Sequence, residues 1–222
     1  MSSPSTSDNT GFHLLNERSR EPAMLWNGAH DARDVCGTSY GVVLEGPVRL
    51  TCDVGTFELR SEMYFSVVGP WRIEGGAGVM VHAPEYQGVF QLGGPLEAEG
   101  RLRYIDGCTD SLLLGPLVCG DPCLNFLHLP EASQQSMHVH PSLRAGVVLS
   151  GEGVCVTEHG EFPLRRGTGF VIDAHTRHAF RPRRGALRVA AFHPDSDTGP
   201  THENHPMLNR TWLDAPSRGD AT

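Results

Sequence analysis

Apolar residues in this chain gather in short runs rather than in long amphipathic stretches. Two such runs, Gly146 to Leu149 and Gly169 to Ile172, are separated by segments that carry Gly and Arg. Short apolar runs between glycine-bearing turns are typical of antiparallel strands in a small barrel. The pattern therefore predicts an all-β protein with few helices.

The same pattern occurs twice. GVVLEG at residues 41–46 returns as GVVLSG at residues 146–151, an offset of 105 residues (146 − 41). Without a gap, this offset also aligns further identical residues: Gly55 with Gly160, Phe57 with Phe162, Leu59 with Leu164, Arg60 with Arg165 and Phe65 with Phe170. Such ungapped identity indicates an internal duplication of one supersecondary unit. The glycine-rich stretch 93–100 is the expected boundary between the copies.

Histidines of the second copy carry the candidate chemistry. His138 and His140 are two residues apart, so on an extended strand both imidazoles leave the same face. His178 follows the apolar runs as a third candidate. Neutral imidazoles that converge from neighbouring strands would form a three-nitrogen metal site with open coordination positions.

The first copy lacks these ligands. The offset places Arg33, Val35 and Ile73 where the second copy has its histidines. The first copy is therefore predicted to be structural and to cover strand edges of the second, and a small-molecule pocket in the first copy is the alternative.

The segment from Met137 to Phe180 resembles the two-part signature of the cupin superfamily. In that signature a Gly precedes His-x-His, a metal-binding Glu and a second Gly follow, and a Pro-x-Gly-x-x-His segment comes later. The residues that fall in place are His138, His140, Gly151 and His178. The departures are Ala132 and His175 in place of two glycines, and Arg144 in place of the glutamate.

Together with the duplication, this resemblance implies a bicupin, with two tandem cupin-type antiparallel β-barrels of jelly-roll character. Residues 1–20 are expected to be disordered, 21–97 to form the degenerate barrel and 98–195 the metal-binding barrel. The last segment, 196–222, is expected to pack back on the body through Met207, Leu208 and Trp212.

Composition limits the partners. The net charge of −8 argues against nucleic acid or an anionic membrane, and no apolar run approaches the length of a membrane span. The six cysteines follow no secretory segment and form no CxxC motif, which favours reduced thiols in the cytoplasm. A homodimer is left open.

Two further residues are candidates for catalysis. Arg144 follows the ligand pair with the spacing that puts it on the ligand face, where its guanidinium would clamp an anionic substrate. A bulge that turns it to solvent is an equal alternative. His128 lies on the strand predicted for residues 124–129, from which it could serve as a fourth ligand, a substrate contact or a base, or be an ordinary core histidine.

The resemblance favours a three-histidine Fe(II) dioxygenase acting on a small anionic substrate. A non-redox isomerase, cyclase or lyase that uses Zn, Ni, Mn or Cu is the alternative, and a small-molecule-binding module without turnover is a third hypothesis. The fold itself cannot separate them, because one fold hosts many chemistries.

Overall fold

The computed structural model describes residues 10–15 and 22–212, and nearly all of its regular structure is extended. The all-β prediction is confirmed. The strands in chain order are β1 (Phe12–Leu15), β2 (Ala23–Asn27), β3 (His30–Ala32), β4 (Thr38–Glu45), β5 (Val48–Cys52), β6 (Gly55–Leu59), β7 (Tyr64–Val68), β8 (Trp71–Glu74), β9 (Ala77–Ala83), β10 (Gln91–Gly93), β11 (Leu102–Arg103), β12 (Thr109–Leu114), β13 (Cys123–Leu129), β14 (Arg144–Thr157), β15 (Gly160–Arg165), β16 (Gly169–Ile172) and β17 (His178–His193). Among the described residues there is one 3-10 turn, η1 (Ile105–Gly107), which precedes β12.

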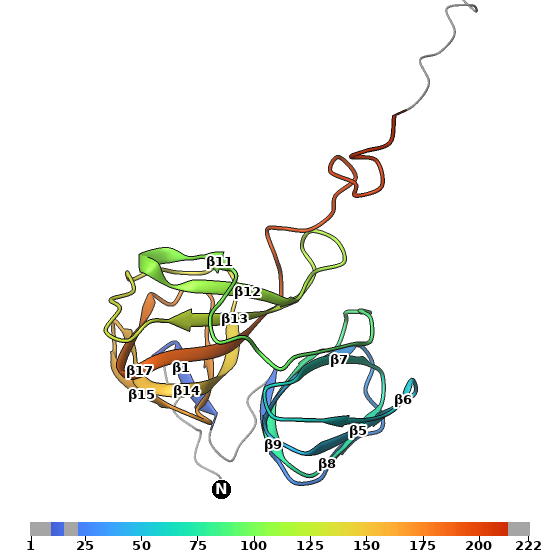
Figure 1. The fold of residues 1–222 in the computed structure, drawn as a ribbon, viewed down its shortest axis with the longest axis horizontal. Coiled ribbons are helices and arrows are strands. Elements are labelled where there is room, and N and C mark those ends of the chain that lie inside the picture. Colours follow the sequence, from blue (N-terminus) through green and yellow to red (C-terminus); the bar gives the residue numbers. More distant parts are fainter. Residues whose placement is uncertain (1–9, 16–21, 213–222) are drawn as a thin grey trace, which may run out of the picture.

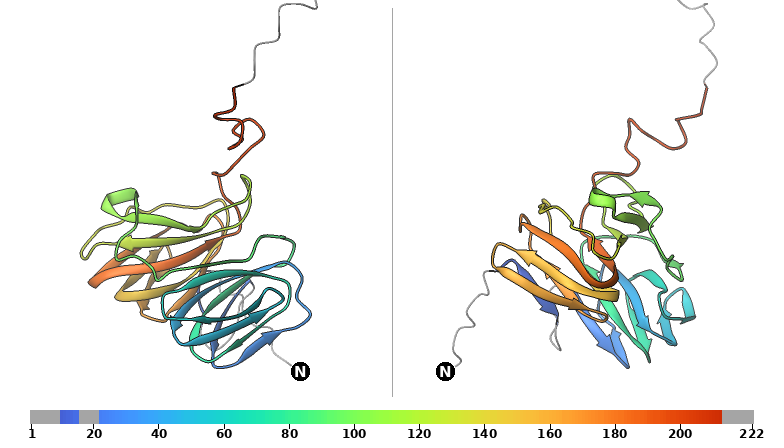
Figure 2. Two further views of the ribbon diagram at one scale, coloured as in Figure 1. Left: turned by 45° about the vertical axis from the view of Figure 1, so that its right-hand side comes forward. Right: turned by 60° about the vertical axis from the view of Figure 1, so that its left-hand side comes forward.

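These strands form three antiparallel sheets. One has the order β10-β7-β4-β9-β2 and another the order β3-β8-β5-β6. The third has the order β1-β16-β14-β17-β13-β12-β11, with β15 added beside β14. Figures 1 and 2 show that the first two sheets make one body and the third sheet curves into a second body beside it. No helix in the described parts of the chain is long and apolar enough to cross a membrane.

Strand pairing in the two bodies repeats with the offset found in the sequence. Gly41 faces Phe65 across β4 and β7, and Gly146 faces Phe170 across β14 and β16. Leu50 faces Phe57 across β5 and β6 in the way that Cys155 faces Phe162 across β14 and β15. Each of these four residues of the second body lies 105 positions after its counterpart. The identical residues of the two copies therefore occupy equivalent sites in the sheets.

The two bodies differ in whether their long strands are continuous. In the second body β14 and β17 each run unbroken through the curved sheet, and their pairing shifts register at three places between Val148 and Gly153. In the first body the equivalent of β14 is split into β4 and β5 at Gly46 and Pro47. Proline has no N–H to donate to a ladder, so it ends the pairing there.

Three clusters of buried side chains hold the molecule together. One fills the first body around Phe65 and Trp71, and one fills the second around Phe12 and Phe170. The third lies between the bodies and joins residues of both, including the ring pair of Tyr40 and Phe192, whose centroids are 5.0 Å apart. The centre of the seam is therefore a continuous hydrophobic core.

An ion pair crosses the same seam. The guanidinium of Arg188 on β17 donates to both carboxylate oxygens of Glu62, at 2.8 and 3.0 Å, and lies 5.2 Å from the ring centroid of Phe126. The Arg188 and Glu62 side chains are only 16% and 32% exposed. This bidentate contact therefore helps fix the orientation of one body against the other.

The N-terminal segment corrects the prediction of disorder for residues 1–20. Phe12–Leu15 forms β1 and pairs with β16 of the second body, with Phe12 opposite Ile172. Phe12 is buried, with its ring centroid 4.8 Å from that of Phe162. Three apolar side chains in a four-residue run were enough to cover the edge of β16. The rest of the predicted stretch, residues 1–9 and 16–20, lies outside the described residues.

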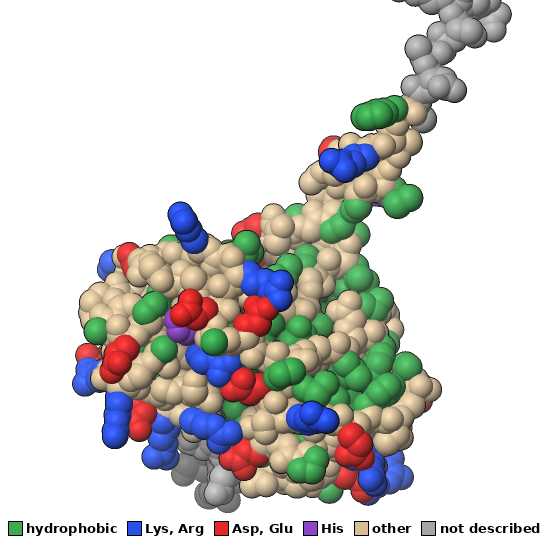
Figure 3. Space-filling model, in the orientation of Figure 1, with side chains coloured by type: hydrophobic (Ala, Val, Ile, Leu, Met, Phe, Trp, Pro, Cys, Tyr) green, Lys and Arg blue, Asp and Glu red, His purple; other side chains and the backbone are tan. Residues whose placement is uncertain are grey.

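The prediction that the tail packs back on the body is wrong for its described part. Met207, Leu208 and Trp212 are 76%, 61% and 93% exposed. Figures 1 and 3 show the segment projecting away from the two bodies. Its only described backbone contacts with the body precede these residues, where Cys119 and Gly120 donate to the carbonyls of Pro200 and Ser196. Three separate apolar side chains in a turn-rich segment provide no periodic face for a core to bury.

Candidate metal centre

The three histidines predicted as ligands lie together at one end of the second body. Ring centroids are 4.9 Å apart for His138 and His140, 4.6 Å for His138 and His178, and 5.2 Å for His140 and His178. One ring nitrogen of each lies within 4.8 Å of the corresponding atoms of the other two. The predicted cluster is therefore formed in three dimensions.

Backbone hydrogen bonds bring these residues together. His138 and His178 form an isolated antiparallel bridge, in which each N–H donates to the other's carbonyl at 2.9 Å. The N–H of His175 donates to the carbonyl of His140 at 2.8 Å. The loop that carries the first two ligands is further attached to β17 by the buried side chain of Gln135, whose amide oxygen accepts from Phe180 N at 2.8 Å.

The tautomers suit a metal site. Nδ1 of His138 donates to the carbonyl of Ser136, and Nδ1 of His178 donates to the carbonyl of Thr176, each at 2.8 Å. A proton held on Nδ1 leaves Nε2 bare, with its lone pair available to a metal. Two ligands are therefore oriented by their own loop backbone.

Charge also favours metal-binding forms. Burial, followed by the neighbouring Arg144 guanidinium and the other imidazoles, lowers the pKa of His140 to about 3. Burial lowers the pKa of His178 to about 4. Both are neutral near pH 7, which is the form that coordinates a metal.

The residues fit a divalent transition metal. An imidazole nitrogen lies about 2.0 to 2.1 Å from a bound zinc, so two ligands of one ion are at most about 4.2 Å apart. The observed limit of 4.8 Å needs only a small rotation of the rings to close on an ion. Three neutral nitrogen donors without a carboxylate suit iron, zinc, copper or nickel better than calcium or magnesium.

Both departures from glycine in the signature keep the backbone that glycine favours. Ala132 has φ 62° and His175 has φ 61°, in the left-handed region. Residues other than glycine adopt this backbone region at a cost of roughly 1 to 2 kcal/mol each. The loops around the histidines therefore keep their shape despite the substitutions.

A cavity of about 60 Å³ adjoins the three imidazoles. Its apolar wall consists of Leu127, Phe170, Ile172, Phe180 and Ala191, and its polar wall consists of Tyr104, Asp110, Asn125, Gln135, Arg144 and His193. The open side of the histidine cluster therefore faces a pocket of mixed polarity from which a small molecule can reach a bound ion.

His193 is a site residue that sequence reasoning left out. It ends β17 and lines the cavity, with its ring centroid 6.4 Å from that of His140. Burial and then Arg144 lower its pKa to about 3. Alternation along β17 could have identified it, because side chains two residues apart on a strand share a face and Ala191 and His193 both line the cavity. Grouped with the irregularly spaced histidines of the tail, His193 gave no such indication.

Arg144 lines the cavity rather than turning to solvent. Its Nη1 donates to Ser142 Oγ at 2.7 Å and to the carbonyls of Leu143 and Ser142 at 2.9 and 3.2 Å. Ser142 Oγ in turn donates to Asp195. Nε of Arg144 is buried and has no hydrogen-bond partner among the described residues. Nη1 anchors one edge of the guanidinium, and Nη2, which has no hydrogen-bond partner among the described residues, is left for a ligand.

The far side of the cavity carries a second polar pair that sequence reasoning did not single out. Asn125 on β13 donates to Asp110 Oδ1 on β12 at 2.8 Å. Burial raises the pKa of the Asp110 carboxyl, against the opposing effect of the Asn125 hydrogen bond. No sequence motif marks either residue, and only the pairing of β12 with β13 brings them to the cavity.

The structure does not place His128 in the site. Its strand neighbours Asn125 and Leu127 line the cavity, and His128 does not. Opposite it on β17 is Arg188, which faces the seam with Phe126. His128 is buried there, with Nδ1 3.4 Å from Thr109 Oγ1. Strand alternation was the right rule, but the register was off by one residue because Leu124 and Phe126 occupy the seam core.

The first body has no equivalent site. Ile73 is fully buried in its core, Val35 packs against that core, and Arg33 is exposed and paired with Asp31. In the part of the chain that the structure describes, the three histidines of the second body are the only group of His, Cys, Asp or Glu side chains arranged to hold a metal.

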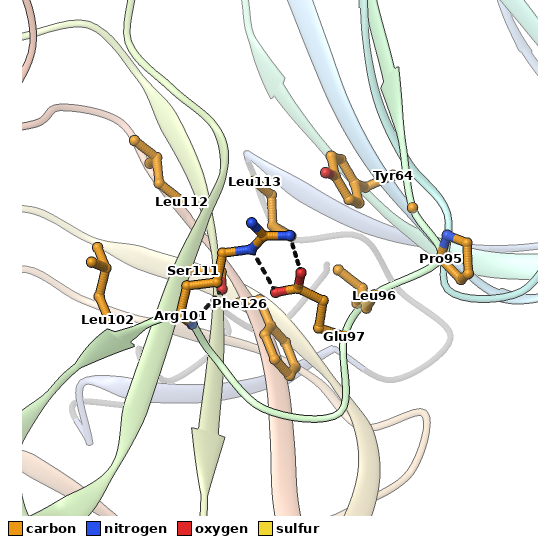
Figure 4. Close-up of a pocket in the computed structure, with 11 residues that line it drawn as sticks. Tyr64, Pro95, Leu96, Glu97, Arg101, Leu102, Ser111, Leu112, Leu113 and Phe126 are labelled. Carbon is orange, nitrogen blue, oxygen red and sulfur yellow. Dashed lines mark hydrogen bonds and ion pairs between the residues drawn. The ribbon is translucent and has the colours of Figure 1, made fainter.

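A larger cavity of about 560 Å³ lies at the seam, away from the histidines. Figure 4 shows Tyr64, Leu96 and Phe126 around it, with the Glu97 carboxylate paired to the Arg101 guanidinium. No histidine or cysteine lines it. Its size suits a ligand, but the one carboxylate in its lining, Glu97, is already paired with Arg101.

Comparison with known proteins identifies the class of domain. Residues 125–189 match the family model of the Cupin domain, which spans the three histidines, Arg144 and most of β17. The all-β architecture agrees with the barrel fold of solved cupin-domain structures. No match was found among curated proteins.

Solved structures show the same fold at low identity. A cupin 2 conserved barrel domain protein from Leptotrichia buccalis is 12% identical with a TM-score of 0.56, over 84% of this chain and 90% of that one. A variant of the salicylate 1,2-dioxygenase from Pseudoaminobacter salicylatoxidans is 10% identical with a TM-score of 0.59, over 78% and 70%. A putative glyoxylate induced protein from Pseudomonas aeruginosa is 13% identical with a TM-score of 0.57, over 86% and 81%.

Proposed function

We propose that this chain is a metal-dependent cupin enzyme, a three-histidine Fe(II) dioxygenase-type oxidoreductase that acts on a small anionic substrate. The observation that carries the proposal is the convergence of His138, His140 and His178 on one cavity that Arg144 also lines. The fold likeness to a salicylate 1,2-dioxygenase supports it.

The protein's own groups divide the work. The three imidazoles would hold the iron, which when bound supplies a place for dioxygen beside the substrate. Arg144 attracts and orients the anionic group, and Ser142 with Asp195 keeps the guanidinium in place. The apolar side chains of Phe170, Ile172 and Phe180 exclude water from the reacting groups.

The duplication supports a bicupin architecture, in which residues 21–97 are a degenerate cupin barrel and residues 98–195 the metal-binding one. Its support is the 105-residue offset shared by identical residues and strand registers. In this proposal the first barrel has lost its ligands and covers the face of the second through the seam core. All six cysteines are free, which supports a reducing compartment such as the cytoplasm.

A non-redox function is the second candidate, and His193 is the observation that favours it. Its neutral imidazole lies in the cavity, where it could hydrogen-bond and orient a substrate held on zinc, nickel or manganese. An isomerase, cyclase or lyase would use such a group.

Metal content and oxygen uptake test the proposal. Protein purified without added metal is expected to contain about one iron per chain, and replacement of both His138 and His140 by Ala is expected to abolish it. His30→Ala and His82→Ala, in the first body, form the matched control. Anaerobic Fe(II) loading followed by exposure to oxygen with a panel of small carboxylates should give substrate-dependent oxygen uptake. Turnover with zinc and without oxygen would instead establish the non-redox candidate.

A further inference from the structure

The size of the metal cavity limits its substrate. The cavity measures about 60 Å³. A bound water needs roughly 10 to 15 Å³ on this scale, so about four to six water-sized groups fill the space. An aromatic ring with a carboxylate exceeds that number of groups, whereas a short aliphatic acid does not.

The position of the anion-binding group further defines the ligand. Arg144 presents Nη2, which has no hydrogen-bond partner among the described residues, next to a guanidinium edge that Ser142 and Leu143 hold through Nη1. Its charge is partly compensated by Asp195, through Ser142, and no described carboxylate forms a direct ion pair with it. A carboxylate would both satisfy this nitrogen and complete the neutralisation of the site.

The remaining walls require a short carbon skeleton with a second oxygen. Leu127, Ile172 and Ala191 give the cavity a mainly apolar surface, which suits a methyl or ethyl group. Three nitrogen ligands leave open positions on a metal, and an oxygen next to the carboxylate can occupy one of them. The Asp110 and Asn125 pair offers a further polar contact beyond the apolar wall.

We propose that the site takes a short aliphatic carboxylate with an oxo or hydroxyl group on the neighbouring carbon, containing about six non-hydrogen atoms, with its carboxylate on Arg144. This inference rests on the proposed function, because it assumes a metal on the three histidines. It narrows the substrate class from any small anion to short 2-oxo or 2-hydroxy acids, and it excludes aromatic acids.

The test uses the full chain with Co(II) as the probe metal, without oxygen. Visible absorption first measures whether Co(II) binds and whether His138→Ala abolishes the binding. Calorimetry then measures binding of lactate, lactamide, mandelate and benzoate to the Co(II) protein. Lactate is expected to bind and to shift the Co(II) spectrum. Lactamide, which lacks the charge, should bind roughly ten- to a hundredfold more weakly. Mandelate and benzoate should not bind.

The outcomes separate the two proposals. If Co(II) does not bind at the histidines, the proposed function fails and the substrate inference with it. If Co(II) binds but mandelate or benzoate binds as tightly as lactate, or lactate does not bind at all, the substrate inference is overturned and the metal site stands. Equal binding of lactamide and lactate would overturn the assignment of Arg144.

A change of cavity size provides a second measurement. Leu127→Ala removes most of one apolar wall and should let the Co(II) protein bind mandelate. Leu112→Ala on the neighbouring strand, where the side chain is 43% exposed and outside the cavity, is the matched control and should not. If Leu127→Ala folds, as its thermal unfolding shows, and still rejects mandelate, the cavity does not set the size limit.

Discussion

Replacement of Arg144 by Gln tests the electrostatic reasoning about the site. Arg144 holds its position through Nη1, which donates to Ser142 Oγ at 2.7 Å and to the Leu143 carbonyl at 2.9 Å, and its Nε is unpaired. Glutamine is shorter and neutral, so it keeps a polar amide near the same loop but removes the cation from the cavity. The three imidazoles are untouched.

Two opposite effects follow from the loss of the charge. Arg144 lowers the pKa of His140, so its removal relieves repulsion and metal binding should be unchanged or tighter. A charge-assisted contact to a substrate carboxylate is worth about 1.5 to 3 kcal/mol, so the affinity for that carboxylate should fall roughly ten- to a hundredfold. The same loss should appear in kcat/KM once a substrate is known.

The assay measures metal content by elemental analysis and carboxylate binding by calorimetry. Arg177→Gln is the matched control, because Arg177 lies near the ligand segment but is 57% exposed and 3.8 Å from Glu158. A variant at position 144 that binds the carboxylate with the affinity of the wild type would refute the role of this residue. Arg144→Glu should bind metal more tightly and carboxylates poorly, because its carboxylate can fill one open position and repels the ligand.

Two further predictions concern stability. Gly151 has φ 85°, and a Cβ there would lie 2.2 Å from the Ala186 carbonyl oxygen. Gly151→Ala should therefore lower the free energy of unfolding in urea by more than about 1 kcal/mol. Gly185→Ala, at φ 69° with nothing within 4 Å, should lower it less, and equal losses would contradict the steric argument. The metal-free protein should lose stability as the pH falls from about 6.5 toward 4, by at most about 1.4 kcal/mol per pH unit for each buried imidazole. The reason is that His140, His178 and His193 have pKa values of about 3, 4 and 3 in the folded protein, so the unfolded chain takes up protons first. His193→Phe should make this dependence shallower, and an unchanged slope would show that His193 does not contribute.

Local pattern was sufficient for several features of this protein. Short apolar runs between glycines favour strands, because each run is too short to form the apolar face of a helix before the next turn begins. The ligand pair also follows from local geometry, since His138 and His140 leave an extended segment on one side. The matching of Gly41 with Gly146 needed only an alignment of the chain with itself, and the strand registers repeat with the same offset.

Other features depend on contacts between segments distant in the chain. His193 and Asp110 reach the cavity only because β17 and β12 both pair, directly or through β13, with the strands beside the ligands. His128 is two residues from the seam residue Phe126, and that core decides which face of β13 turns outward. A shift of one residue moves every side chain of a strand to the other face, so local pattern alone could not assign His128.

The same reason accounts for Arg144 and for the two ends of the chain. Whether a strand residue faces solvent or a cavity depends on its anchors, and Ser142 and Asp195 hold Arg144 from a loop and from beyond β17. Phe12 is buried on the strand that pairs with β16, whereas the side chain of Trp212 remains exposed. Burial of an apolar side chain requires a partner surface, and only the packed tertiary structure shows whether one exists within reach.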